Sequence, residues 1–300
     1  MGVREDWKYG YPSQKEWGWP AAIEIFCGGT AGGTYILSVL PYLLFSGGIF
    51  LPGVCASLVL VWLSVFILVA ESTSLWRLPR AFFNIKSPLA LGAISLSLLI
   101  ISSIATLGIL YTGFATGALP IVVWLGVVVS LLTILYPGAL MSLMKAIPFW
   151  SGSGPSFLLL SAGLMSGSAV ITLAGGLGKL NFSLSRVTLG LLVIYGLFLL
   201  IYIVTGRRSS RTAQISVQRL IKGHLFLIFI VGVMAMGLVT PFVLYITGMI
   251  SSSAPLLYIG SSLILIGGIL MRYSLIASAV KMPVLSEDSI SATYWLDRRG

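Results

Sequence analysis

Charged residues are scarce in this chain, and four of them gather in one stretch between two apolar segments. Only 9% of the residues are charged, yet residues 71–92 (ESTSLWRLPRAFFNIKSPLALG) hold four charges, at Glu71, Arg77, Arg80 and Lys86. A short connector between membrane helices needs no such cluster. We interpret the stretch as one wall of a site at the membrane–water boundary.

Three further polar residues lie inside apolar segments. Glu24 lies about one turn inside the first segment, where a carboxylate costs about 3 kcal/mol unless it is protonated, paired or hydrated. It is either a structural acid, ion-paired or reaching the interface, or a group that exchanges protons beside a redox ligand. The hydroxyl of Tyr136 needs a partner, either a local one or a ligand carbonyl. Arg272 either extends to the interface or balances a buried acid.

The composition excludes a soluble fold. Hydrophobic residues make up 57% of the 300 residues, and the mean hydropathy is +1.03. A membrane-spanning helix needs about 20 apolar residues, and an isolated span must satisfy its own backbone hydrogen bonds. The sequence therefore predicts an all-α integral membrane protein with eight transmembrane helices. The spans are predicted at 21–45, 52–70, 89–111, 121–144, 155–178, 187–205, 225–250 and 255–279.

Positive charge is distributed unevenly between the loops. With eight spans, both termini and the loops after the second, fourth and sixth spans lie on one side. Of the 18 Lys and Arg residues, only Lys179 and Arg186 fall in the opposite loops, while Arg272 lies within a span. Because cytoplasmic loops carry the excess of Lys and Arg, we expect a plasma-membrane protein with both termini in the cytoplasm. The most basic loop, 207–222, either lies on anionic lipid headgroups or docks a soluble subunit.

The sequence lacks the residues that several kinds of site require. His224 is the only histidine, whereas a membrane haem commonly needs two axial ligands of the His or Met type. Cys27 and Cys55 are isolated within apolar segments, so they do not form a metal cluster. No hydrolase motif is present. We expect no metal or haem bound by this chain itself, and the net charge of +10 needs no nucleic-acid partner, since topology explains it.

Small residues recur four positions apart in the first and fifth predicted spans. They are Gly28, Gly29, Gly32 and Gly33 in the first span, and Gly163 and Gly167 in the fifth. This spacing lets membrane helices approach closely, so helix packing is its simplest explanation. A repeat of two four-helix units would also place these two spans at equivalent positions.

Four stretches resemble, in order, the polysulfide reductase membrane-subunit family, also called NrfD-like. They are WGWPAAIEIFCGGTAGG (17–33), LWRLPRAFFNIKSPLALG (75–92), IPFWSGSGPSFLLLSAGLMSG (147–167) and IGGILMRYSLIA (266–277). The first is similar to the family's first helix and the second to the loop after its second helix. The third is similar to the link into helix five, and the fourth to the Gly-Gly…Arg-Tyr pattern of helix eight.

The resemblance implies a membrane anchor subunit of a multi-subunit redox complex. Such a subunit exchanges electrons between a quinone of the menaquinone or ubiquinone type and a four-cluster-type iron–sulfur subunit. That partner serves a molybdopterin catalytic subunit containing Mo or W. The implied organisation is two four-helix bundles, 20–150 with the quinone pocket and 151–280, flanked by an interfacial segment (1–19) and a polar tail (281–300).

The resemblance also implies roles for particular residues at the terminus side of the first bundle. Proton exchange is expected at Glu24 and Glu71. The quinone pocket is expected to include Tyr136, Arg77, Trp76, Gly28 and Gly32. Docking of the iron–sulfur subunit is expected at Trp17, Trp19, Arg80, Lys145 and Trp150.

Two other classes of protein remain open from the sequence. An ion-coupled transporter also fits a bundle with an intramembrane acid, and Pro41, Pro137 and Pro241 could break its helices. Transporters, however, place such features near the midplane, whereas the polar residues here cluster at one interface. A structural anchor that binds no quinone is the other alternative.

Overall fold

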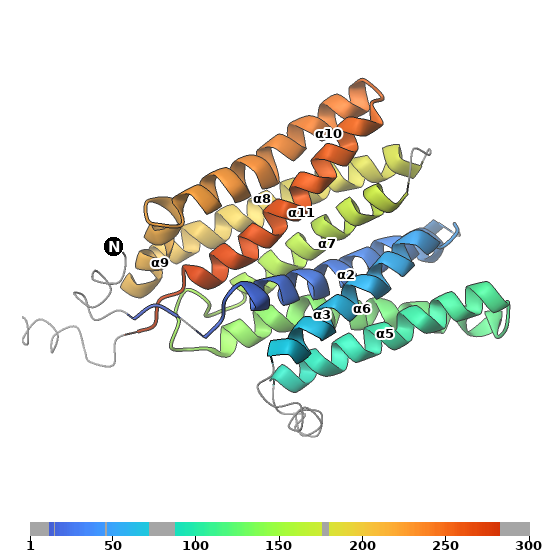
Figure 1. Cartoon of the computed structure of the whole chain (residues 1–300), viewed down its shortest axis with the longest axis horizontal. Coiled ribbons are helices and arrows are strands. Elements are labelled where there is room, and N and C mark those ends of the chain that lie inside the picture. The colour runs from blue at the N-terminus through green and yellow to red at the C-terminus, as the bar shows by residue number, and fades with distance from the viewer. Residues whose placement is uncertain (1–11, 15, 46, 72–87, 176–179, 283–300) are drawn as a thin grey trace, which may run out of the picture.

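The protein is a bundle of long helices that run back and forth along one direction (Figure 1). The computed structural model describes residues 12–14, 16–45, 47–71, 88–175 and 180–282. The helices are α2 (Trp19–Phe45), α3 (Leu51–Glu71), α5 (Pro88–Thr112), η2 (Thr116–Ala118), α6 (Leu119–Leu143), α7 (Gly154–Ala174), α8 (Leu180–Arg208), α9 (Arg211–Ile221), η3 (Leu227–Val239), α10 (Thr240–Ile250) and α11 (Ala254–Ala277). Within these residues, eight helical segments are long and apolar enough to cross a membrane. The predicted all-α membrane fold with eight spans is confirmed.

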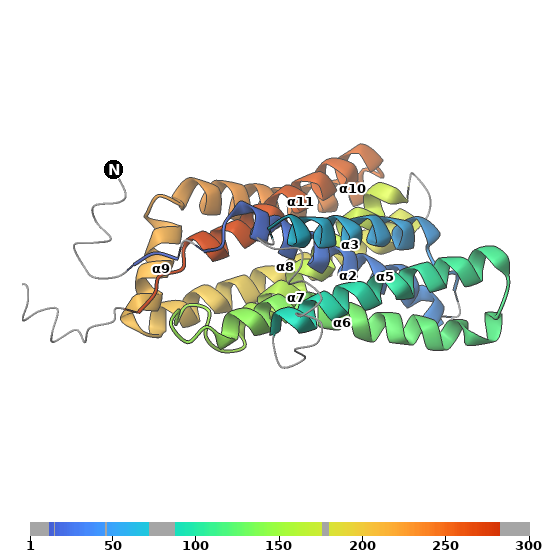
Figure 2. The same cartoon turned by 60° about the horizontal axis from the view of Figure 1, so that its bottom comes forward.

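Helix α2 is the central element of the bundle. It contacts α3, α6, α7 and α11, and 78% of its most apolar stretch is buried, against 28% for α3. Figures 1 and 2 show it surrounded by helices from both halves of the chain. Its many small residues permit this position, because they let several neighbours approach its backbone.

The glycines of α2 and α7 lie against each other. A Cβ atom added at Gly163 would lie 2.9 Å from the carbonyl oxygen of Gly29 and 3.0 Å from the side chain of Ile134. A Cβ atom at Gly167 would collide with the backbone of Gly33. The spacing of four residues therefore marks a helix crossing at which the two backbones touch.

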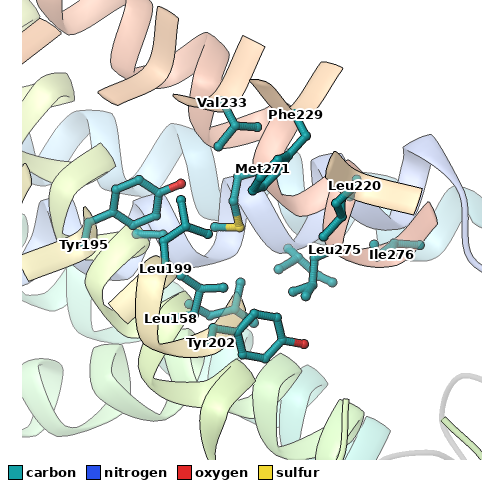
Figure 3. Packing of buried hydrophobic residues seen from close by; sticks show 14 of the residues in the cluster. Leu158, Tyr195, Leu199, Tyr202, Leu220, Phe229, Val233, Met271, Leu275 and Ile276 are labelled. Atoms are coloured by element: carbon teal, nitrogen blue, oxygen red, sulfur yellow. The ribbon is translucent and has the colours of Figure 1, made fainter. Parts of the chain in front are cut away.

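Two clusters of buried apolar residues lie on either side of this crossing. One is formed by α2, α3, α5 and α6, around Tyr35, Leu96 and Leu99. The other is formed mainly by α7, α8, α9, η3, α10 and α11, and Figure 3 shows Met271 and Leu275 packed among residues of α7, α8 and η3. Because Ala22 and Ile25 of α2 belong to this second cluster as well, α2 serves both. The division into two four-helix bundles at residue 150 stays a prediction.

The two ends of the described chain are held together. Ser13 forms an isolated antiparallel bridge with Val280, and the backbone N–H of Gln14 donates to the carbonyl of Ala279 at 3.1 Å. The ammonium of Lys281 forms an ion pair with Glu16. These contacts fix the segment that leads into α2, so Glu16 and Trp17 are placed at the terminus end of the bundle.

Two segments differ from the predicted spans and loops. The basic loop predicted at 207–222 contains the helix α9, which begins after Ser210, whose hydroxyl accepts from the N–H of Ala213 at 3.3 Å. The seventh span, predicted as a regular helix, is π-helical over η3, and the N–H of Thr240 donates to the carbonyl of Ala235, five residues earlier. Pro241 follows immediately and has no N–H to donate to the carbonyl of Gly237. One i→i+4 backbone hydrogen bond is therefore missing where η3 meets α10.

Candidate functional site

A hydrogen-bonded carboxyl group lies inside the bundle at its terminus end. Glu24 is 5% exposed, and its Oε1 accepts from the hydroxyl of Tyr136 at 2.5 Å and from that of Ser64 at 3.2 Å. The hydroxyl of Ser64 also lies 3.2 Å from the backbone carbonyl of Glu24. Three helices, α2, α3 and α6, therefore contribute one polar group each to the same point.

Glycines on neighbouring helices make room for these polar groups. A Cβ atom at Gly28 would lie 3.1 Å from the hydroxyl oxygen of Ser64, so α3 approaches α2 closely beside Glu24. A Cβ atom at Gly92 of α5 would lie within 3.0 Å of several ring atoms of Tyr136. The ring of Tyr136 thus packs against the α5 backbone, which directs its hydroxyl toward Glu24.

A cavity of about 260 Å³ adjoins this group. Its lining combines residues of α2, α3 and α6 with two residues that precede α2. They are Glu16, Trp17, Ala21, Glu24, Ile25, Leu68, Tyr136, Pro137 and Leu140. Pro137 has no N–H to donate to the carbonyl of Thr133, so α6 lacks one backbone hydrogen bond beside the cavity, although the helix continues. The lining is mixed: apolar side chains alternate with the polar groups of Glu16, Glu24 and Tyr136.

This arrangement is suited to exchange a proton with an apolar ligand. A carboxyl group close to two hydroxyls, next to a partly apolar cavity, can take up or release a proton at its Oε atoms. The hydroxyl of Tyr136 donates its single proton to Glu24 here and becomes a donor to a ligand only if that bond is exchanged. Neither alternative for Tyr136 named the partner that the structure gives: its hydroxyl donates to Glu24 of another helix. A bond to a ligand carbonyl stays a prediction.

The other predicted pocket residues fall into two groups. Trp76 and Arg77, with Arg80 from the docking set, lie outside the described residues, as does the rest of the charged stretch up to residue 87. Glu71 ends α3, and only its backbone is described. Gly28 and Gly32 are buried at helix contacts: a Cβ atom at Gly32 would lie 2.8 Å from the carbonyl of Ser130 in α6. They shape the first cluster without lining the cavity.

The aromatic residues predicted for docking are mostly engaged within the chain. Trp17 stacks on Trp150 with ring centroids 5.4 Å apart, and Trp19 stacks on Tyr273 at 3.8 Å. Trp150 has no exposed surface, and its Nε1 donates to the carbonyl of Leu275 at 3.0 Å. It therefore presents no face to a partner, whereas Trp19 is 42% exposed and Lys145 is exposed.

Arg272 does not extend to the membrane surface, so that alternative is wrong. Its side chain is 1% exposed, its Nη1 donates to the carbonyl of Gly268 at 2.9 Å, and its guanidinium lies 5.1 Å from the ring centre of Phe26. Its Nε and Nη2 have no hydrogen-bond partner among the described residues. Arg272 is buried because it lies on the face of α11 that packs against α2 and α7.

Sequence reasoning missed several residues of the site. Ser64, Leu68 and Leu140 were not singled out, although one contacts Glu24 and the other two line the cavity. Serines are frequent in these spans and often bond to their own backbone, as Ser38 does to Thr34. The sequence held one signal for Ser64, namely its depth within the second span. Because α3 runs antiparallel to α2, Ser64 lies near the end of α3 that meets Glu24.

The fold and site together define a polytopic helical membrane protein with a protonatable pocket at one end of its spans. A family model described as polysulphide reductase, NrfD, matches residues 9–283. The match covers most of the chain, and the protein belongs to the NrfD family. No curated protein matches the chain. Within the described residues, no group of three or more His, Cys, Asp or Glu side chains is placed to hold a metal ion.

Proposed function

We propose that this protein is the quinone-reactive membrane anchor of a multi-subunit redox complex. The cavity bounded by α2, α3 and α6 holds the headgroup of a menaquinone- or ubiquinone-type quinone. Electrons pass between this quinone and an iron–sulfur partner, which serves a molybdopterin-containing catalytic subunit. Glu24 exchanges the protons, and when quinone binds, the single O–H of Tyr136 turns from Glu24 to donate to a quinone carbonyl. The complex lies in the plasma membrane, with both termini of the chain in the cytoplasm.

The observation that carries this proposal is the hydrogen-bonded pair of Glu24 and Tyr136 beside a cavity with both polar and apolar lining. Reduction of a quinone consumes protons at its carbonyl oxygens, so the site must supply a donor within hydrogen-bond reach. The cavity, at about 260 Å³, is close to the lower limit of about 300 Å³ for small-molecule sites. That size suits a ring headgroup whose isoprenoid tail remains in the bilayer.

The position of the cavity supports electron transfer to a soluble partner. Glu24 is the sixth residue of α2, which places its Cα about 7.5 Å along the helix from the first residue. A quinone bound there lies near the end of the bundle rather than at its midplane. We propose that Trp19 and Lys145, together with Arg80, contact the iron–sulfur subunit at this end.

Co-purification tests the partners. The protein is extracted from its native membrane in mild detergent, and the material is examined by mass spectrometry and metal analysis. We expect stoichiometric subunits containing iron–sulfur clusters and Mo or W. A clean, metal-free chain would contradict the anchor and favour the ion-coupled transporter.

Replacement of the acid tests the pocket. In the purified complex, Glu24→Gln removes the proton-exchanging group but keeps the size of the side chain. We expect quinol turnover to fall by roughly 100-fold, as is common when a general acid or base is lost. Glu24→Asp retains a carboxyl group and should retain part of the turnover. Full turnover in Glu24→Gln would remove Glu24 from the mechanism.

A further inference from the structure

A second cavity lies outside the quinone pocket, in the angle between α8 and α9. Its volume is about 430 Å³. One lining residue, Arg207, belongs to the last turn of α8, and the others belong to α9 or follow it directly. The α9 residues are spaced at three, four and seven positions, so they form one stripe of that helix. They are Gln214, Val217, Gln218 and Ile221, followed by Lys222.

Helix α9 is held firmly against the bundle, so the groove has a fixed shape. Val217 and Leu220 are 1% and 3% exposed and belong to the second buried cluster. A Cβ atom at Gly206 of α8 would lie 3.0 Å from the Val217 side chain, so the two helices meet closely. Figure 3 shows Leu220 packed near residues of η3 and α11.

The charges in the groove are all of one sign. Arg207 and Lys222 are exposed cations on its rim, and Gln214 and Gln218 add amide N–H donors. No acidic residue occurs anywhere between Arg207 and Lys222. Two cations with amide donors suit a phosphate group, to which a guanidinium can donate two parallel hydrogen bonds.

The groove also has an apolar part, formed by Val217 and Ile221. The span of α8 ends at Arg208, so Arg207 lies where a membrane helix reaches the headgroup region. Amphipathic basic helices such as α9 lie at this level, with cations toward anionic lipid. A ligand found there with a phosphate and an adjoining hydrocarbon chain is a phospholipid.

We propose that the groove between α8 and α9 binds one anionic glycerophospholipid. Arg207 and Lys222 hold its phosphate, Gln214 and Gln218 donate to its headgroup oxygens, and Ile221 contacts the upper part of an acyl chain. A carboxylate-bearing partner protein would also satisfy the cations, but the groove lies where the span of α8 reaches the headgroup region, which favours the lipid. The site is independent of the quinone pocket, so either can fail without the other.

Native mass spectrometry of the detergent-solubilised complex tests this site. The complex is titrated with phosphatidylglycerol and, separately, with phosphatidylcholine of the same acyl chains. We expect retention of phosphatidylglycerol in preference to phosphatidylcholine. The double variant Arg207→Gln/Lys222→Gln should bind phosphatidylglycerol on the order of ten- to thirty-fold more weakly, from the loss of two cations near the headgroups.

Arg208→Gln is the matched control, because Arg208 is also exposed in the last turn of α8 but does not line the groove. It should retain the lipid. Equal binding of both lipids, or an equal loss in the control, would overturn the proposal. Displacement of the lipid by inorganic phosphate would indicate a free-anion site. Loss of a partner subunit from the double variant, with lipid binding unchanged, would make the groove a protein docking site instead.

Discussion

The hydrogen bond between Tyr136 and Glu24 allows a quantitative test of the site. Tyr136→Phe removes one hydroxyl and keeps the ring that packs against Gly92. A hydrogen bond to a charged group contributes about 1.5–3 kcal/mol in soluble proteins, whereas interhelical bonds in membrane bundles average about 0.6 kcal/mol, with a maximum near 1.7. Because the Tyr136–Glu24 bond is short, at 2.5 Å, and Glu24 is buried while Tyr136 is half-buried, we expect a loss of about 1 kcal/mol.

The chain offers a matched control for this substitution. The hydroxyl of Tyr202 donates to the carbonyl of Phe149 at 2.6 Å and is also buried. Tyr202→Phe therefore removes the same group and a similar bond from another part of the bundle. Both variants should unfold at slightly lower temperature, by about 2 °C for 1 kcal/mol in a chain of this size. Only Tyr136→Phe should raise the KM for quinol.

A double-mutant cycle separates the bond from other effects of the substitutions. Free energies of unfolding are measured for Glu24→Gln, for Tyr136→Phe and for the double variant. Residues in direct contact show coupling energies of about 0.5–3 kcal/mol, whereas independent sites add. We expect coupling for Glu24 with Tyr136 and near-additivity for Glu24 with Tyr202. Additive effects in the Tyr136 cycle would refute the proposed geometry of the site.

Three further predictions concern the frame around the site. Gly33→Ala introduces a Cβ atom that would collide with the backbone of α7, so the yield of folded protein in size-exclusion chromatography should fall sharply. Gly108→Ala is the control: a Cβ atom there meets nothing within 4 Å, and the variant should fold normally. Arg272→Met removes a buried guanidinium with two unpartnered nitrogens and should raise the free energy of unfolding by about 1–4 kcal/mol, measured by denaturation. A decrease would show that its contacts with Gly268 and Phe26 outweigh the cost of burying the charge. In the detergent-solubilised protein, a maleimide should label Cys55, which is exposed in the second turn of α3, faster than the buried Cys27, as followed by mass spectrometry. Labelling of Cys27 as fast as Cys55 would contradict the packing of α2.

The spans could be predicted because apolar length is their defining property, but their ends were less accurate. The sixth span was predicted at 187–205, whereas α8 begins at Leu180 and ends at Arg208. Polar residues at the ends of a helix lower the local hydropathy. A search for apolar length therefore stops before them, although the helix continues. The same criterion missed α9, which is amphipathic and basic. The π-helical turns of η3 could not be predicted, since a uniformly apolar sequence has no pattern that distinguishes i→i+4 from i→i+5 bonding.

The candidate site was partly visible in the sequence for an electrostatic reason. Glu24 and Tyr136 stand out because a carboxyl group and a hydroxyl in an apolar span must have partners. Which partners they have depends on the crossing of α2, α3 and α6, and a single sequence does not contain that geometry. Ser64 was missed although its depth was a signal, because serines in these spans often bond to their own backbone. Trp150 was expected on the docking surface but is buried. Its burial follows from the close approach of α7 and α11.

Photoaffinity labelling with an azido-quinone in native membranes tests the central claim most directly. The labelled peptides are mapped by mass spectrometry, with and without an excess of unmodified quinone. We expect competed labelling on residues that line the cavity, in the segments around Trp17, Glu24 and Leu140. Labelling confined to α8, α10 or α11, or labelling that unmodified quinone does not reduce, would contradict a quinone site between α2, α3 and α6.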